Sequence, residues 1–221
     1  MKRREHSRLF CDIVNQLNTN KLSDKPALAL FDFDGTISNK DSFVAFMKFT
    51  HGKPVFVMRM AMGFLTFAGW KLGLVKSHFT KVKALRSFYK GWTEEQMTDA
   101  RKRFTAEVIP NILFPKAIEK INWHKEQGHR IIVVTASCNA WLGDWTDQMH
   151  LEILCTEMEI KNGVYTGGLS KPNCRGKEKV NRVKQHLNLD DYSEVYAYGN
   201  DHGDNQLLAI ADHQHFREFE E

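Results

Sequence analysis

The chain has 221 residues, enough for one substantial core with an insertion or for two small domains. Hydrophobic residues make up 42% of it and charged residues 26%, a balance typical of globular proteins that argues against a disordered or fibrous chain. The formal net charge is +4, and much of the excess lies in the opening segment MKRREHSR, so nucleic-acid binding is not indicated for the body of the protein.

Residues 1–26 form a basic lead-in, which is predicted to contain a short amphipathic helix with Leu9, Phe10, Ile13, Val14 and Leu17 on one face. No apolar segment of the signal-peptide kind follows the basic residues, so we do not expect a secretory signal. The four cysteines, Cys11, Cys138, Cys155 and Cys174, lack the spacing of a metal site or a disulfide framework. We therefore expect reduced thiols and a cytoplasmic protein.

An apolar strand, Ala27 to Phe33, follows Pro26 and ends among two aspartates, Asp32 and Asp34. Carboxylates this close repel each other and resist burial. The pattern therefore predicts a cation or a reactive group at the end of this strand.

Residues 38–111 have a helical pattern throughout and are rich in Phe, Met and Lys. Their longest apolar run, Pro54 to Trp70, contains Arg59 and is short for a membrane span. Packing among helices and contact with a membrane surface both remain open for this run, so location at the inner membrane surface is kept as an alternative.

Strands and helices alternate in the rest of the chain. We expect helices at 116–128, 139–149, 176–187 and 205–212, strands over RIIVVTAS (130–137) and EVYAY (194–198), and a hairpin turn at Asn162-Gly163. Strands that are apolar on both faces and alternate with helices predict an α/β fold, with a parallel sheet covered by helices. The helical block 38–111 would then be an insertion.

Polar clusters stand at three of the predicted strand ends: Asp32 with Asp34, residues 135–137, and residues 200–204. Ligands of such sheets bind beyond the carboxyl ends of the strands, so we expect one shared site. A carboxylate there can act as a nucleophile on phosphorus, and a second one two residues on can exchange protons. Phosphoryl transfer also needs positive charge, commonly from Mg²⁺ and a lysine.

Four motifs in order resemble the haloacid dehalogenase superfamily of phosphatases: DFDGT (32–36), VVTAS (133–137), GKEK (176–179) and YGNDHGD (198–204). The resemblance covers about residues 27–212. It implies a Rossmann-like core over 27–37 and 112–221, with a helical C1-type cap inserted at 38–111.

The resemblance also implies site residues. Asp32 would be the nucleophile that becomes aspartyl phosphate, Asp34 the general acid and base, and Thr135 a hydrogen-bond donor to phosphate. Lys177 and Lys179 compete to neutralise the phosphate, and similarity to phosphoserine phosphatases favours Lys177 slightly. The substrate-binding set is Gly35, Thr36, Asp41, Ala136 and Ser137, and the Mg²⁺ set is Asp32, Asp34, Asn200 and Asp204.

The sequence departs from the family pattern at several of these positions. Asn200 stands where the family usually has an aspartate, which removes one negative charge near the metal. Asp41 replaces the glutamate with which phosphoserine phosphatases recognise their amino acid, and TAS replaces their SGG. The pattern looks closer to a bacterial subgroup that includes phosphatidylglycerophosphate phosphatases.

The sequence thus predicts a Mg²⁺-dependent phosphatase acting on a small phosphomonoester or on a phospholipid head-group phosphate. A non-catalytic phosphate- or lipid-binding protein on the same fold, and a phosphotransferase, are the alternatives. A calcium loop at Asp32 is disfavoured because a strand precedes it and its glycine is misplaced. His202, His213 and His215 lack zinc-ligand spacing, and Trp141 and Trp145, one helical turn apart, are expected to face the core.

Overall fold

The computed structural model describes residues 25–62 and 77–220. The amphipathic helix predicted near the N-terminus, Cys11 and the second half of the apolar run 54–70 lie outside the described residues. Within the described ranges, no helix is both long and apolar enough to cross a membrane.

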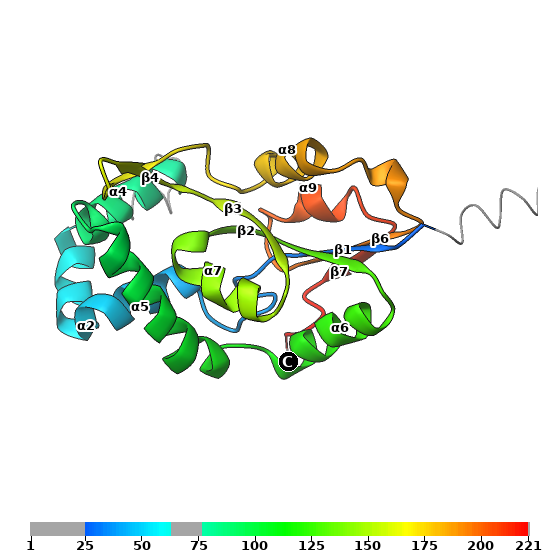
Figure 1. Ribbon diagram of the computed structural model, residues 1–221, viewed down its shortest axis with the longest axis horizontal. Helices are drawn as coiled ribbons and strands as arrows, with labels where there is room; N and C mark the ends of the chain where they lie inside the picture. Colours follow the sequence, from blue (N-terminus) through cyan, green and yellow to red (C-terminus); the bar gives the residue numbers. More distant parts are fainter. Residues whose placement is uncertain (1–24, 63–76, 221) are drawn as a thin grey trace, which may run out of the picture.

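A five-stranded parallel sheet forms the centre of the molecule (Figure 1). Its strands lie in the order β3 (Glu152–Thr156), β2 (Arg130–Cys138), β1 (Leu28–Phe31), β6 (Val195–Gly199) and β7 (His213–Phe216). The strand β1 is central and pairs with β2 on one side and β6 on the other. The predicted parallel sheet is therefore confirmed, and three strands that carry polar clusters are direct neighbours.

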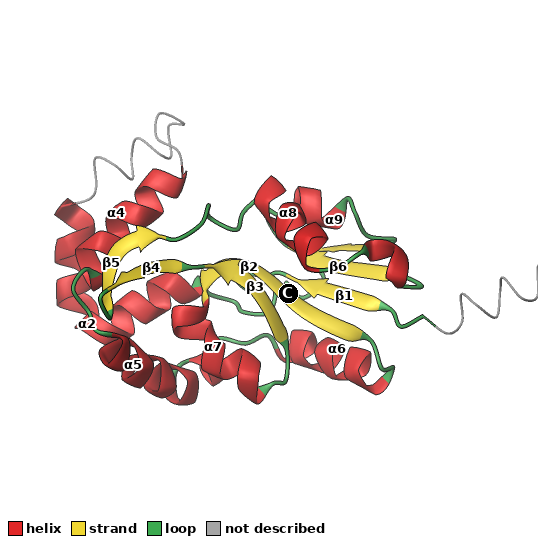
Figure 2. Ribbon diagram, turned by 45° about the horizontal axis from the view of Figure 1, so that its top comes forward, coloured by secondary structure: helices red, strands yellow, loops and turns green. Residues whose placement is uncertain are grey.

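Helices cover both faces of this sheet (Figure 2). The helices α6 (Pro115–Glu126) and α7 (Asn139–Gln148) lie on one face, and α8 (Lys177–His186) and α9 (Asn205–Leu208) lie on the other. Side chains along β1 alternate between two cores, with Ala29 and Phe31 in one and Leu28 and Leu30 in the other. A strand apolar on both faces is buried on both faces, as its composition predicts.

The described part of residues 38–111, which lies between β1 and β2, is mostly helical, as expected. It contains α2 (Ser42–Met62), α4 (Ser77–Tyr89) and α5 (Glu94–Glu107), followed by the 3₁₀ turn η1 (Ile109–Asn111). The helix α2 is interrupted at Gly52, whose φ of 76° breaks the helical path just before Pro54. Aromatic rings join this segment to α7, with Phe46 packing against Phe104 and Trp141.

A two-stranded hairpin packs on the inserted helices rather than on the main sheet. It consists of β4 (Met158–Lys161) and β5 (Val164–Leu169), and its turn contains Asn162 and Gly163, both with positive φ. Backbone hydrogen bonds tie it to the α4–α5 connection, where Gly91 donates to Tyr165 O and Tyr165 donates to Trp92 O, each at 2.8 Å. This hairpin lies within residues 112–221, the range expected to form the core, yet it packs on the helices that lie between β1 and β2.

The C-terminal edge of the sheet differs from the expectation. The predicted helix 205–212 ends at Leu208, and the strand β7 that follows was not predicted. Its sequence, HQHF, is largely exposed and has no apolar alternation. The strand is held partly by ring stacking, because His213 lies 4.3 Å from Tyr196 and His215 lies 4.4 Å from Tyr198 between ring centroids.

Two further expectations, about the buried tryptophans and the free cysteines, hold among the described residues. Trp141 and Trp145 are buried in the core. Cys138, Cys155 and Cys174 are buried free thiols.

Candidate active site

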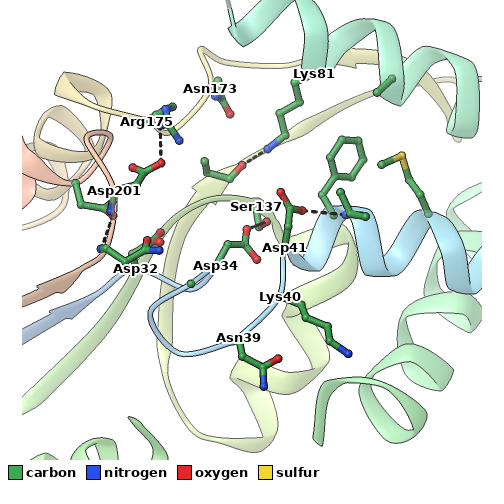
Figure 3. Close-up of a pocket in the computed structure, with 18 of the residues that line it drawn as sticks. Asp32, Asp34, Asn39, Lys40, Asp41, Lys81, Ser137, Asn173, Arg175 and Asp201 are labelled. Atoms are coloured by element: carbon green, nitrogen blue, oxygen red, sulfur yellow. Dashed lines mark hydrogen bonds and ion pairs between the residues drawn. The ribbon is translucent and has the colours of Figure 1, made fainter. Parts of the chain in front are cut away.

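A cavity of about 460 Å³ opens at the carboxyl ends of β1, β2 and β6 (Figure 3). Polar groups from the core, including Asp32, Asp34 and Lys179, line one part of it. Side chains from the inserted helices line the other part: Phe43, Val44, Met47, Met60, Lys81 and Ala84. The cavity therefore has charged side chains on its floor and a mostly apolar wall on the side of the helices.

A buried lysine joins two carboxylates at the base of the cavity. Lys179 Nζ donates to Asp32 Oδ1 and to Asp204 Oδ1, both at 2.6 Å, and the lysine is only 1% exposed. Burial raises the pKa of Asp32 to about 7; Lys179 works against that rise, and the nearby carboxylates of Asp204 and Asp34 add to it. The pKa of Lys179 is raised by the two aspartates despite its burial.

The other oxygen of Asp204 holds the loop after β6. Asp204 Oδ2 accepts hydrogen bonds from the backbone N–H groups of Asn200 (3.0 Å) and Asp201 (3.2 Å). Gly199 leaves room for this arrangement, because a Cβ there would lie 2.5 Å from the Cβ of Asp204. Asp204 thus orients both the lysine and the loop that carries Asn200.

Asp34 is held by two serines. Its Oδ1 accepts a hydrogen bond from the backbone N–H of Ser42 at 2.7 Å, and its Oδ2 accepts one from the Ser137 hydroxyl at 2.5 Å. Burial, assisted by the charge of Asp41, raises the pKa of Asp34, and the serine hydrogen bonds oppose that rise. Figure 3 shows Asp34 and Ser137 facing each other beside Asp41.

Gly35 allows the loop after Asp34 to lie directly against the side chain of Asn200. It has a φ of +82°, which favours glycine, and a Cβ there would lie 2.0 Å from Asn200 Nδ2. The side chain of Asn200 therefore packs directly on the loop after Asp34. This close approach explains why the DFDGT turn needs glycine at that position.

The two predicted threonines do not line the cavity. Thr135 is fully buried, and its hydroxyl accepts a hydrogen bond from the backbone N–H of Ser137 at 3.0 Å. Thr36 is also buried, and its hydroxyl has no hydrogen-bond partner among the described residues. Ala136 and Ser137 do line the cavity, so the end of β2 reaches the site through these two residues.

Only one of the two candidate lysines reaches the carboxylates. Lys179 joins Asp32 to Asp204, whereas Lys177 is exposed and lies outside the cavity lining. The slight preference for Lys177 is therefore not supported by its position. The two residues stand about 200° apart around α8, so the seating of the helix on the sheet decides which one faces inward.

Several lining residues were not anticipated. Lys81 of α4 donates a hydrogen bond to the backbone carbonyl of Ala136, and its Nζ lies 5.5 Å from the ring centroid of Phe43. Arg175 forms an ion pair with Asp201 at 2.6 Å at the cavity edge. No motif marks Lys81, because it lies in a helical segment with many lysines; Arg175 directly precedes GKEK.

The oxygen atoms of the site suit a hard divalent cation. Lys179 pairs with Asp32 and Asp204, and Asp34 lines the same cavity, so three carboxylates and one ammonium lie at its floor. Over the whole lining, five carboxylates stand against four cationic side chains, so negative charge is in slight excess. Within the described residues, no hydrogen-bond donor contacts Asp32 Oδ2 or Asn200 Oδ1, and both residues line the cavity. No group of three His, Cys, Asp or Glu side chains in the described ranges forms a ready metal cluster, so a cation here would also use amide and backbone oxygens.

Comparison with known proteins defines the class to which this site belongs. The model of the haloacid dehalogenase-like hydrolase family matches residues 29–209. Protein CicA of Caulobacter vibrioides (strain NA1000 / CB15N) is 32% identical over 206 residues, which span 91% of this chain and 90% of CicA. The chain therefore belongs to the haloacid dehalogenase-like hydrolase family, which confirms the resemblance seen in its motifs.

Other similar proteins agree with this assignment. Probable phosphatase Rv3661 of Mycobacterium tuberculosis (strain H37Rv) is 25% identical over 197 residues, which span 84% of this chain and 66% of Rv3661. A crystal structure of a protein of unknown function from Bordetella pertussis Tohama I has the same fold, with a TM-score of 0.73, 22% identity, and coverage of 85% of this chain and 87% of that one.

Proposed function

We propose that the protein is a phosphatase that hydrolyses phosphomonoesters through a phosphorylated Asp32. The observation that carries the proposal is the pairing of two differently held carboxylates at one cavity. Asp32 lies against a buried ammonium, whereas Asp34 is held by hydrogen-bond donors on both oxygens. Such a pair suits a nucleophile beside a proton carrier.

The proposed reaction has two steps. In the first, an Asp32 oxygen attacks phosphorus, the phosphorus–oxygen bond of the ester breaks, and Asp34 gives its proton to the leaving alkoxide. In the second, Asp34 takes a proton from a water that attacks the phosphoryl group, the bond between phosphorus and Asp32 breaks, and inorganic phosphate leaves. Lys179 offsets the negative charge of Asp32 in both steps, and Asp204 keeps the lysine in place.

Mg²⁺ is the proposed cofactor, because the site offers hard oxygens and excess negative charge. Asp32, the backbone carbonyl of Asp34 and the amide oxygen of Asn200 would hold it. Both oxygens of Asp204 already accept hydrogen bonds, so we assign Asp204 to positioning Lys179 and the loop. Bound Mg²⁺ would neutralise charge on the phosphate oxygens.

The substrate is proposed to be a small phosphomonoester or the head-group phosphate of a phospholipid. The apolar wall formed by Phe43, Val44 and Met47 would contact the organic part of the ester, and Lys81 adds a positive charge on the same side. Because the wall comes from the inserted helices, residues 38–111 are proposed to act as the cap that selects the substrate.

The test is phosphate release from a panel of esters, measured with Mg²⁺ and with EDTA. The panel contains p-nitrophenyl phosphate, phosphoserine, sugar phosphates, nucleotides and phosphatidylglycerophosphate. We expect Mg²⁺-dependent release by the wild type and a loss of at least about 10³-fold in Asp32→Asn. Full activity in Asp32→Asn would contradict the nucleophile assignment.

A phosphate- or lipid-binding protein is the second candidate, and it is favoured by one observation, the amide at position 200 in place of a carboxylate. No release from any ester by folded wild-type protein would support it. Transfer of the phosphoryl group to an added alcohol faster than to water would instead indicate a phosphotransferase.

A further inference from the structure

A chain of hydrogen bonds runs from Trp141 to Asp34 through two serines; its first two bonds are buried and the last, to Asp34, is partly buried. Trp141 Nε1 lies 3.1 Å from Ser42 Oγ, Ser42 Oγ lies 2.9 Å from Ser137 Oγ, and Ser137 Oγ lies 2.5 Å from Asp34 Oδ2. Trp141 and Ser42 are fully buried, and Ser137 is 1% exposed. We refer to these three side chains together as the serine relay.

While Asp34 is ionised, the donor and acceptor of every hydrogen bond in the serine relay follow from the groups at its two ends. An indole N–H can only donate, so Ser42 Oγ accepts from Trp141. When Asp34 is ionised, as it is after it has given up its proton, its carboxylate can only accept, so Ser137 donates its single proton to Asp34 Oδ2. Ser42 must then donate to Ser137, and all three donors point toward Asp34.

The relay joins three separate elements at one carboxylate. Trp141 comes from α7, Ser42 is the first residue of α2, and Ser137 is near the end of β2. Ser42 acts twice, because its backbone N–H donates to the other oxygen of Asp34 at 2.7 Å. The plane of the Asp34 carboxylate is therefore held from both oxygens.

The ring of Trp141 is packed independently of its N–H group. It stacks on Phe43 with ring centroids 5.2 Å apart and on Phe46 with centroids 5.7 Å apart. The variant Trp141→Phe keeps an aromatic ring in this stack and removes the donor together with part of the buried ring volume, so a second Trp→Phe variant is needed to measure the effect of the lost volume. The hydrogen bond and the packing can therefore be separated by mutation.

We propose that Ser42 and Trp141 are positioning residues, which act through Ser137 to hold the Asp34 carboxylate in the orientation required for proton transfer. This inference rests on the proposed function. Neither residue lies in a motif of the family pattern, and Trp141 does not line the cavity. Their effect on the reaction would be exerted entirely through Asp34.

The kinetic test compares two esters that differ in their need for a proton. A p-nitrophenolate leaves readily without protonation, whereas an alkoxide must be protonated as it leaves. We expect Ser42→Ala and Trp141→Phe to lower kcat/KM for an alkyl phosphate about 10- to 100-fold and to lower it much less for p-nitrophenyl phosphate. Ser42→Thr, which keeps a hydroxyl, should recover part of the loss.

Trp145→Phe is the matched control. Trp145 lies one turn further along α7, is also buried and packs edge-to-face on Phe33, but it has no hydrogen bond to the relay. We expect Trp145→Phe to change kcat/KM by the same factor for both esters, or to leave it unchanged. Equal losses for both esters in Ser42→Ala and Trp141→Phe would show that the relay only supports the fold, and would overturn the proposal.

A second measurement tests the relay without turnover. In ¹⁵N-labelled protein, the indole N–H resonance of Trp141 should shift in Ser42→Ala and in Asp34→Asn, whereas Asp41→Asn should leave it in place. An unchanged resonance in Ser42→Ala would overturn the relay even in an active enzyme. Absence of turnover in the wild type, together with the expected shifts, would instead remove the proposed function and with it the positioning role.

Discussion

Lys179 is the most deeply buried charge in the candidate site. It contacts Asp32 and Asp204 at the same distance, 2.6 Å, and removing it would leave two buried carboxylates without the cation that pairs with them. Loss of one partner from a buried ion pair typically costs about 3–5 kcal/mol. The residue therefore serves stability as well as the proposed chemistry.

The two lysines of the GKEK motif give a matched pair of variants. We expect Lys179→Met to abolish phosphate release and to lower the free energy of unfolding by about 3 kcal/mol or more, because Asp32 and Asp204 lose their partner. We expect Lys177→Met to stay within about 0.5 kcal/mol of the wild type, since Lys177 is exposed. Urea denaturation and phosphate release measure both quantities. Inactivity of the Lys177 variant alone would reverse the assignment.

At the scale of elements, the hairpin β4–β5 extends the inserted segment. The two parts are far apart in the sequence, yet β5 pairs with the connection between α4 and α5 by backbone hydrogen bonds. The backbone of Arg86 on α4 also lies against Gly167 of β5. The wall of the cavity thus depends on contacts between the insertion and a hairpin from the second half of the chain.

Alanine substitutions at two glycines of this hairpin distinguish the stability cost of lost space from the cost of backbone strain. Gly167 and Gly163 have nearly equal φ values, 75° and 74°. A Cβ at Gly167 would lie 2.4 Å from Arg86 Cα, whereas a Cβ at Gly163 would meet nothing within 4 Å. We expect Gly163→Ala to cost about 1 kcal/mol from strain, and Gly167→Ala to cost roughly 1–3 kcal/mol more. Urea denaturation tests this, and equal losses would show that the hairpin can move away from α4.

At the scale of the whole molecule, the burial of Asp32 makes the free energy of unfolding depend on pH. The pKa of Asp32 is raised from 3.8 to about 7 in the folded protein, mainly by burial. Between these values the unfolded chain has released a proton that the folded protein still holds. The unfolded state binds fewer protons, so the free energy of unfolding falls as pH rises through this window.

The Asp32→Asn variant lacks this titration. In EDTA, we expect its Tm relative to the wild type to rise by on the order of 5 °C between pH 5 and pH 8. Added Mg²⁺ should stabilise the wild type and remove most of the difference, because a bound cation favours the ionised carboxylate. Melting curves by circular dichroism measure both effects. A Tm difference independent of pH would show that Asp32 is ionised throughout the range.

Much of the fold and part of the site could be predicted from the sequence, because these features depend on local patterns. Runs that are apolar on both faces predicted β1, β2 and β6, and the polar residues that end them predicted which side chains would meet at one edge of the sheet. The helical insertion and the Asn162-Gly163 turn are likewise properties of short segments. The strand β7 was missed because its exposed histidines carry no strand pattern, and ring stacking on β6 helps to hold it.

The sequence alone determined that two aspartates end a buried strand beside a glycine turn, which is enough to predict a reactive site. Only the tertiary structure decided which lysine reaches them, because Lys177 and Lys179 differ only in the face of α8 on which they lie. Only the tertiary structure joined Trp141, Ser42 and Ser137 at Asp34, and placed the hairpin against α4. These contacts link residues from about 70 to about 150 positions apart in the chain, and such contacts are set by how elements pack rather than by any local sequence preference.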